Sequence, residues 1–230
     1  SGTAMPDEFK SDLTAQQLSE VVNWGFAPGV SSFTSTQTSP TNQSTLNYNL
    51  TLSQSVSDLA LSDFDLTNTT ATGCTIQNLT GSGTTYSLSV AGCSEGDVVL
   101  NLKANSVTGV ANQTGPAALS PANTVIVDRG PPTVALVQPS PTPNKGPTLN
   151  FQLTSSEALL GSNLTASDFT VSPSGTGCVI GTPTGSSSPY TIPVSGCPSG
   201  SNVSLTLSAL SISDSAGNNA PASAINTSAN

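Results

Sequence analysis

Two segments of the chain share a cysteine-bounded pattern that constrains its fold more than any other feature. "GCTIQNLTGSGTTYSLSVAGC" runs from Gly73 to Cys93, and "GCVIGTPTGSSSPYTIPVSGC" runs from Gly177 to Cys197. In both segments the two cysteines lie nineteen positions apart. Runs that alternate apolar and polar residues flank a turn rich in Gly and Ser, which predicts a β-hairpin. We therefore expect one β-rich unit, written twice.

The similarity between the two copies extends well beyond the hairpins. "TLNYNLTLS" (45–53) matches "TLNFQLTSS" (148–156), and "VVLNLKANSV" (98–107) matches "VSLTLSALSI" (203–212), at an offset of 103 to 105 residues. A self-similarity of this length indicates a duplicated domain. Turn residues recur about every 8–12 positions, which is typical of an all-β sandwich. The inward-facing residues expected from the alternation are Leu46, Tyr48, Leu50, Phe64, Tyr86, Leu88, Leu100 and Leu102, with Leu149, Phe151, Leu153, Phe169, Tyr190, Leu205 and Leu207 as counterparts.

The hairpin geometry predicts one disulfide in each copy, Cys74–Cys93 and Cys178–Cys197. The cysteines lie at the mouth of each hairpin, where they are close enough to bond. Closing a loop of about 20 residues stabilises a domain by roughly 3 kcal/mol in the chain-entropy model. Buried free thiols are one alternative. Zinc is another, but it prefers closely spaced cysteines with further Cys or His ligands. Disulfides favour an oxidising compartment, so we expect an extracellular or cell-surface location.

Composition excludes several classes of partner. Charged residues make up 7% of the chain, the net charge is −9, and the four cations are scattered at Lys10, Lys103, Arg129 and Lys145. Nucleic-acid binding draws its affinity from clustered cations, so we expect no nucleic-acid partner. No apolar run approaches the ~20 residues of a spanning helix, so we expect no direct membrane insertion. The first residues lack the features of a signal peptide, and we interpret the chain as a piece of a longer secreted protein rather than as a cytosolic one.

Three segments carry a resemblance to a known family. They are "TSSEALLGSNLTASDF" (154–169), "ISDSAGNNAPA" (212–222) and the linker "VDRGPPTV" (127–134). With their counterparts in the first copy, they resemble the bacterial-type immunoglobulin-like (Big) tandem repeats of large extracellular surface and adhesin proteins. The resemblance implies an all-β fold of tandem immunoglobulin-like β-sandwiches. The first copy departs from the family pattern, because it has Gln54 where the second copy has Glu157, and its closing turn has lost the Gly.

The resemblance also suggests domain boundaries. We expect the tail of a preceding immunoglobulin-like repeat at 1–24, one β-sandwich repeat at 25–129 and a second at 130–230. The helix-like stretch at 11–22 and Trp24, which we expect to pack against a neighbouring domain, fall at the first boundary. The linker contains Pro131 and Pro132, which restrict the backbone on both sides and predict a joint with a limited range of angles.

Acidic residues raise the question of calcium. Asp58, Asp63 and Asp65 form the densest cluster, but the second copy retains only the middle one, as Asp168. We therefore favour a turn-forming role, in which the carboxylate accepts backbone hydrogen bonds, over a metal site. Asp128 and Asp214, in the linker and in the closing turn, remain calcium candidates, because calcium in linkers is known in similar repeat arrays.

Nothing in the sequence indicates catalysis or a cofactor, and we expect the chain not to be an enzyme. It has no histidine, no phosphate-binding GxxxxGK[ST] loop and few aromatic residues for sugar stacking. The tripeptide Asn-x-Ser/Thr, the acceptor for N-linked glycans, occurs eight times, so glycans are possible partners. The acceptors are Asn42, Asn49, Asn68, Asn78, Asn112, Asn163, Asn202 and Asn226.

These features together predict a structural spacer or adhesive-stalk module of a long extracellular repeat protein. Its expected partners are neighbouring immunoglobulin-like repeats of the same chain, and other copies or proteins of an extracellular assembly. One alternative is a stem or axial component of a polymeric surface appendage, such as a ciliary or flagellar hair. A second alternative is a carbohydrate- or calcium-binding adhesin domain.

Overall fold

The computed structural model of the chain describes residues 27–110, 112–138, 146–173 and 177–227, which belong to two compact units. Unit 1 comprises Ser1–Ser39 and Gln43–Val127, and unit 2 comprises Pro40–Asn42 and Asp128–Asn230. The main division, after Val127, falls two residues before the expected boundary at 129/130. The helix-like stretch at 11–22, Trp24 and the expected tail at 1–24 lie outside the described residues.

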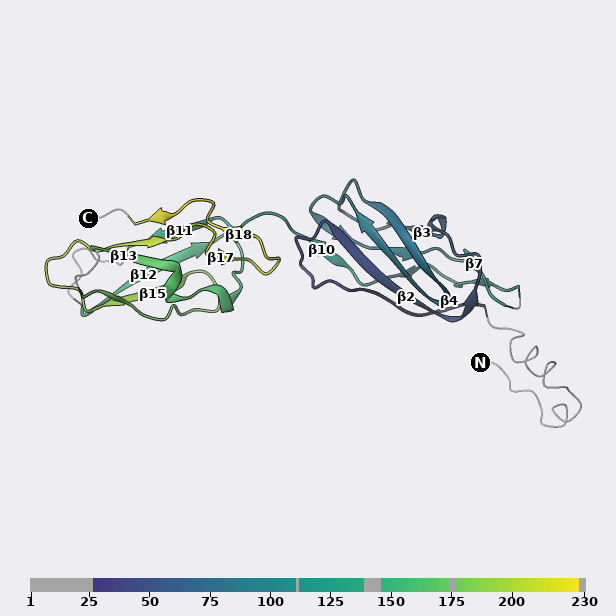
Figure 1. Cartoon of the computed structure of the whole chain (residues 1–230), viewed down its shortest axis with the longest axis horizontal. Helices are drawn as coiled ribbons and strands as arrows, with labels where there is room; N and C mark the ends of the chain where they lie inside the picture. Colours follow the sequence, from purple (N-terminus) through teal and green to yellow (C-terminus); the bar gives the residue numbers. More distant parts are fainter. Residues whose placement is uncertain (1–26, 111, 139–145, 174–176, 228–230) are drawn as a thin grey trace, which may run out of the picture. The chain divides into compact units, whose positions relative to one another are not determined.

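The described residues of unit 1 form β-strands and one turn of 3₁₀ helix (Figure 1). Its elements are β1 (Val30–Ser35), β2 (Thr45–Val56), η2 (Leu61–Asp63), β3 (Phe64–Asp65), β4 (Thr75–Ala91), β5 (Gly96–Val98), β6 (Asn101–Leu102), β7 (Val107–Thr108), β8 (Thr114–Gly115), β9 (Ser120–Pro121) and β10 (Val125–Val127). They form sheets in the orders β1-β2-β4 and β3-β6-β9, with the two-stranded pairs β10-β5 and β7-β8. All of these pairings are antiparallel, as expected for strands joined by tight turns.

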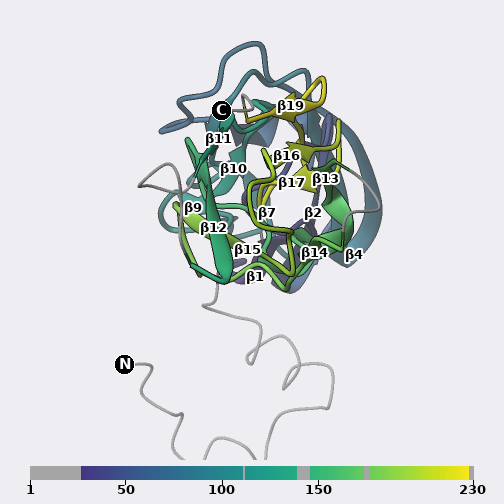
Figure 2. The same ribbon diagram turned by 90° about the vertical axis from the view of Figure 1, so that its left-hand side faces the viewer.

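Unit 2 repeats this arrangement. Its elements are β11 (Val134–Val137), β12 (Thr148–Ser155), η3 (Gly161–Asn163), η4 (Ala166–Asp168), β13 (Phe169–Ser172), β14 (Val179–Ile180), β15 (Tyr190–Ser195), β16 (Ser204–Leu207), β17 (Ile212–Ser213), β18 (Asn219–Ala220) and β19 (Ile225–Asn226). Its sheets run β11-β12-β15-β14 and β13-β16-β19, with the pair β17-β18. Figure 2 looks along the strands of unit 2 and shows these two larger sheets on opposite sides of the unit.

The order of pairing is therefore the same in both units. In each, a long second strand pairs with the first strand on one side and with the hairpin on the other. In each, a short strand that starts at a buried phenylalanine, Phe64 or Phe169, pairs with a strand beyond the hairpin, β6 or β16. The repeated sequence thus specifies a repeated all-β topology.

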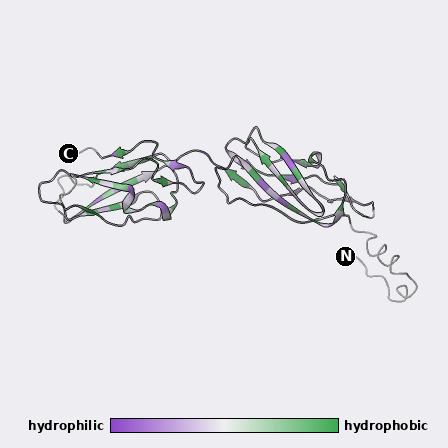
Figure 3. Ribbon diagram, viewed as in Figure 1, coloured by the Kyte–Doolittle hydropathy of each residue, from purple (hydrophilic) through white to green (hydrophobic). Residues whose placement is uncertain are grey.

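Alternation along the strands decides which side chains are buried, and Figure 3 shows it as changes of hydropathy along the ribbons. On β2, Leu46, Tyr48, Leu50 and Leu52 are buried, while the residues between them are exposed or half-buried. Residues from both larger sheets join one apolar cluster in each unit. The expected core residues are buried except Leu149, which is half-buried near the start of β12.

The two hairpins differ in how many residues their strands pair. In unit 1 the hairpin is continuous from Thr75 to Ala91. In unit 2 the matching segment is divided into β14 and β15 and contains Pro183, Pro189 and Pro193. Proline has no N–H to donate to a ladder, so its presence shortens the paired region. Among the described residues of both units, the helices are single 3₁₀ turns, and none is long or apolar enough to cross a membrane.

Two tyrosines in the core of unit 1 have different hydroxyl environments. The hydroxyl of Tyr86 donates to the Val56 carbonyl oxygen at 2.8 Å. The hydroxyl of Tyr48 is fully buried and has no hydrogen-bond partner among the described residues, and burial raises the pKa of Tyr48 to about 12. Its ring packs against Phe33, with centroids 6.2 Å apart, and Phe151 occupies the equivalent position in unit 2.

We predict that Tyr48→Phe leaves unit 1 as stable as before or stabilises it by up to about 2 kcal/mol, because it removes a buried group that has lost its water without gaining a partner. Tyr86→Phe is the matched control, and it should destabilise the unit by about 1 kcal/mol because it removes a hydrogen bond. The free energy of unfolding of both variants, measured by urea denaturation, tests this prediction. A loss of stability with Tyr48→Phe equal to that with Tyr86→Phe would contradict the assignment.

Candidate functional site

Both predicted disulfides are present, one at the mouth of each hairpin. Cys74 and Cys93 are bonded with their Cα atoms 4.2 Å apart, and Cys178 and Cys197 are bonded with theirs 4.3 Å apart. Each bond joins residues of one unit only. The four cysteines are therefore all used in cross-links, and none is a free thiol.

A glycine precedes each cysteine, and the structure gives the reason. Gly73 and Gly92 both have positive φ, and a Cβ atom at either would lie 3.0 Å from the carbonyl oxygen of the other. Gly177 and Gly196 hold the same positions in unit 2, also with positive φ. Glycine is the residue that adopts this backbone conformation without strain. The repeated Gly-Cys pair is thus a steric requirement of bringing the two hairpin ends together.

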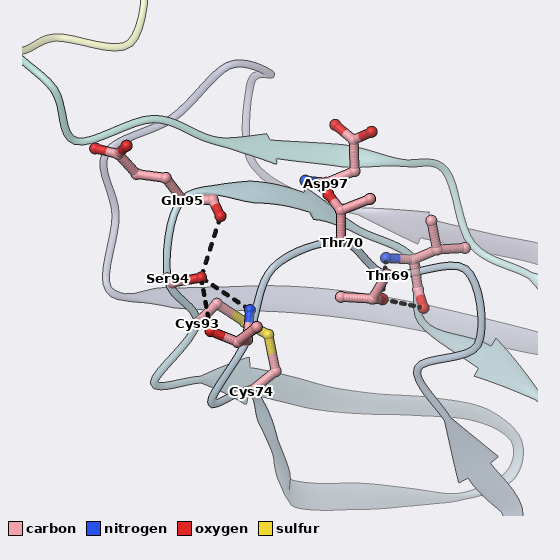
Figure 4. Close-up of a disulfide and its surroundings, with 9 residues drawn as sticks. Thr69, Thr70, Cys74, Cys93, Ser94, Glu95 and Asp97 are labelled. Carbon is pink, nitrogen blue, oxygen red and sulfur yellow. Dashed lines mark hydrogen bonds between the residues drawn. A yellow bond between two sulfur atoms is a disulfide. The ribbon is translucent and has the colours of Figure 1, made fainter.

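The disulfide of unit 1 is supported by a second segment of chain, as Figure 4 shows. Thr72 donates its N–H to the Ser94 hydroxyl and accepts from the Ser94 N–H, each at 2.8 Å. Nearby, the Thr70 N–H donates to the Asp97 carbonyl oxygen at 2.9 Å, and the Asp97 N–H donates to the Thr70 hydroxyl at 2.8 Å. These bonds tie the residues before the first cysteine to those after the second.

Asp63 of the first acidic cluster and its counterpart Asp168 act locally. The carboxylate of Asp63 accepts from the Ala60 N–H at 2.8 Å, and that of Asp168 accepts from the Thr165 N–H at 2.6 Å. Each bond closes the 3₁₀ turn that precedes the buried phenylalanine of the next strand. This is the turn-forming role that the sequence favours.

Asp58 and Asp65 accept hydrogen bonds from other parts of unit 1. Both carboxylate oxygens of Asp58 accept from the Thr108 N–H at 3.0 Å, which holds the pKa of Asp58 below its usual value. Burial alone would raise the pKa of Asp65, but hydrogen bonds from Thr67 and Asn101 outweigh it and leave that pKa lowered. Hydrogen bonds to a carboxylate favour its charged form.

A different acidic cluster has the geometry of a metal site. Within the described parts of the chain, one group of three carboxylates comes close enough to share an ion, and it consists of Asp128, Glu157 and Asp214 in unit 2. One oxygen from each lies within 4.8 Å of the others. Oxygens bound to one Ca²⁺ at 2.3–2.6 Å are at most about 5 Å apart, so the three fit a common ion.

Hydrogen bonds to Asn218 hold two members of this cluster. The carboxylate of Asp214, which is only 1% exposed, accepts from the Asn218 N–H and from its side-chain amide, both at 2.9 Å. The same amide donates to the Asp128 carbonyl oxygen at 3.0 Å. Asp128 and Glu157 are half-buried, so solvent reaches the cluster from one side.

Sequence reasoning found Asp128 and Asp214 but missed Glu157 as a ligand. The signal was present, because the first copy has an uncharged Gln54 where the second copy has Glu157. A bridge pairs Leu159 with Asp214 in unit 2 and Val56 with Gly109 in unit 1, so Gly109 takes the place of Asp214. Unit 1 therefore has Gln54 and Gly109 where unit 2 has two carboxylates. Among the described residues, the carboxylate cluster is therefore found in unit 2.

The structure places all eight glycosylation candidates in exposed positions. Their side chains differ in what they bind. The amide nitrogens of Asn78 and Asn163 donate to the hydroxyls of Ser89 and Ser213, each at 3.0 Å, whereas the amide oxygen of Asn49 accepts from a hydroxyl. The exposed acceptors are Asn42, Asn49, Asn68, Asn78, Asn112, Asn163, Asn202 and Asn226.

A scan against protein-family models gives no match to this chain, and a search of curated proteins finds no similar sequence. The structure alone therefore gives the evidence on class. It defines an all-β protein with two disulfide-bonded units, and disulfides indicate an oxidising environment.

Replacing both cysteines of one pair with serine should destabilise that unit by about 3 kcal/mol, because the open loop regains conformational entropy in the unfolded chain. The pairs Cys74/Cys93 and Cys178/Cys197 close loops of the same length, so the entropic cost should be equal. Thermal unfolding of the two double variants measures this. A much larger loss in unit 1 would mean that the hydrogen bonds around Thr72 and Ser94 depend on the disulfide.

Proposed function

We propose that this chain is a structural module of a long extracellular repeat protein, a spacer or adhesive stalk that holds partners at a distance. In this proposal each unit is an immunoglobulin-like β-sandwich of the bacterial repeat type. One observation carries it: the two units pair their strands in the same order and close the same hairpin with a disulfide. Repeats of one fold are suited to building a long protein, because each added copy increases the length by a fixed amount.

The interior of each unit supports a mechanical role. Each core is filled by apolar side chains from both larger sheets. Tyr190 illustrates how the units are fastened, because its hydroxyl accepts from the Leu159 N–H at 3.2 Å and links the hairpin to the loop after β12. Tyr86 and Val56 make the corresponding link in unit 1. A cross-linked hairpin bonded into its own core resists opening from its edge.

A spacer also needs a stiff joint between consecutive units. Six residues separate β10 from β11, and they include Pro131 and Pro132. Proline fixes φ near −65°, and it disfavours helical conformation in the residue before it. Asp128 restricts the same segment, because its carboxylate accepts from the Gly130 N–H at 3.1 Å.

We predict that the small-angle X-ray scattering profile of the chain fits a narrow set of conformations. The Pro131→Gly variant should require a broader set. Pro131 is exposed, so its replacement should loosen the joint without unfolding either unit. Pro147→Gly is the control, because Pro147 is also exposed but precedes β12 within unit 2. A wild-type profile that already requires a broad ensemble, unchanged by Pro131→Gly, would argue against the spacer.

The carboxylate cluster favours a second candidate function, a calcium-binding adhesin domain. Asp128 lies in the segment between β10 and β11, so an ion bound there would fix this segment to Glu157 and Asp214. Calcium takes six to eight oxygen ligands, so backbone carbonyls or water would complete the shell. Such binding would stiffen a stalk and make its stability depend on calcium.

We predict that millimolar calcium chloride raises the unfolding temperature of unit 2 and that Glu157→Gln removes this effect. A ligand that binds only the folded state at 100 times its Kd contributes about 2.7 kcal/mol. Glu95→Gln, an exposed glutamate of unit 1, is the control and should leave the calcium effect intact. Equal unfolding temperatures with calcium and with a chelator would mean that the cluster holds no calcium.

A further inference from the structure

The outward face of the β1-β2-β4 sheet carries hydroxyl and amide side chains without any charge. Thr34 pairs with Asn49, and Asn49 pairs with Ser87, so these three residues form one row across the sheet. Thr51 and Thr85 form part of the next row. The sequences of the three strands contain no Asp, Glu, Lys or Arg. This face therefore offers hydrogen bonds to a neutral polar ligand.

A depression of about 430 Å³ opens on unit 1 beside Asn49. This volume lies in the range of about 300–1,000 Å³ seen for sites that hold small ligands. Gly81 also lines the depression, and its φ of +113° and its close approach to the backbone of Thr85 require a glycine there. The lining residues that present hydroxyl or amide groups are Asn49, Thr51, Thr80, Thr85 and Ser87.

Two residues of this lining, Asn49 and Thr51, also form an acceptor tripeptide for N-linked glycans, Asn49-Leu50-Thr51. Asn49 is exposed, and its amide oxygen accepts from the Ser87 hydroxyl at 3.0 Å. Its amide nitrogen is the atom that would bear a sugar, and this hydrogen bond leaves that nitrogen unused. Asn78 and Asn163 differ, because their amide nitrogens already donate to hydroxyls.

We infer that Asn49 is a glycosylation site and that the first sugar of its N-linked oligosaccharide lies in the depression beside it. The donor is an oligosaccharide carried on a lipid diphosphate. The Asn49 nitrogen forms a bond to the anomeric carbon of the sugar, the bond from that carbon to the diphosphate oxygen breaks, and the nitrogen gives up one proton. The lipid diphosphate leaves with the bonding electrons. Thr80 and Thr85, which line the depression, then lie beside the sugar.

The glycan would give the two units different surfaces. In unit 2 the position equivalent to Asn49 is Gln152, which pairs with Thr191 on the neighbouring strand. Glutamine is not an acceptor, so the corresponding face of unit 2 stays bare. A glycan on β2 would cover part of the uncharged sheet face of unit 1. This inference does not depend on the spacer function.

The first test is the occupancy of Asn49. The chain is secreted from a eukaryotic cell line and its peptides are mapped by mass spectrometry after enzymatic release of N-glycans. We expect glycan at Asn49, and we expect Asn49→Gln and Thr51→Ala each to lose the mass of one oligosaccharide. Asn49→Gln should fold, because it copies Gln152. Recovery of the Asn49 peptide without sugar, whether or not other sites are occupied, would overturn the assignment.

The second test is the position of the sugar. Hydrogen exchange at Thr80–Ser87 should be slower in the glycosylated chain than in Asn49→Gln, because a sugar in the depression shields this part of the hairpin. Gln152→Asn is the matched control, since it creates the same Asn-Leu-Thr tripeptide in unit 2. It should add an oligosaccharide without changing exchange at Thr80–Ser87. Equal exchange with and without the Asn49 glycan would overturn its placement in the depression.

Discussion

The pairing of one long strand with the disulfide-closed hairpin organises each unit. In unit 1, β2 carries Leu46, Tyr48 and Leu50 on its inner side, and these residues pair with Val90, Leu88 and Tyr86 of the hairpin. The hairpin buries these side chains only when its two halves stay together, which the cross-link between its ends enforces. The other larger sheet, which begins at Phe64, packs onto the surface that results. The core therefore depends on a local covalent constraint.

The chain folds with few charged residues, and uncharged polar side chains take their place. Ser, Thr and Asn cover the outer faces, and many of them bond to the backbone of a neighbouring segment. Thr69 illustrates this, because its hydroxyl accepts from the Val99 N–H at 2.9 Å and donates to the Val99 carbonyl oxygen at 3.2 Å. Asn101, itself buried, donates to Asp65 and Thr67. These bonds satisfy backbone groups where strands of two or three residues cannot.

Duplication has left the two units alike inside and different outside. Tyr48 and Phe151 hold equivalent buried positions in the two cores and differ by one hydroxyl. The differences with chemical consequences lie at outward or terminal positions. Unit 2 has the carboxylate cluster that contains Glu157, and unit 1 has Asn49 beside an open depression. Surface positions can change in one copy without disturbing the packing that both copies share.

The sequence by itself determined the duplication, the strand alternation, the core and the disulfides, because each depends on short-range periodicity or on the spacing of one residue type. It also placed Asp63 and Asp168 in turns, which are local. Only the tertiary structure decided which residues that are far apart in the sequence lie close together in space. It brought Asp128, Glu157 and Asp214 within 4.8 Å of one another, and it placed Asn49 beside Thr80 and Gly81. The periodicity of the sequence does not predict such contacts, because they depend on the order in which the strands pair.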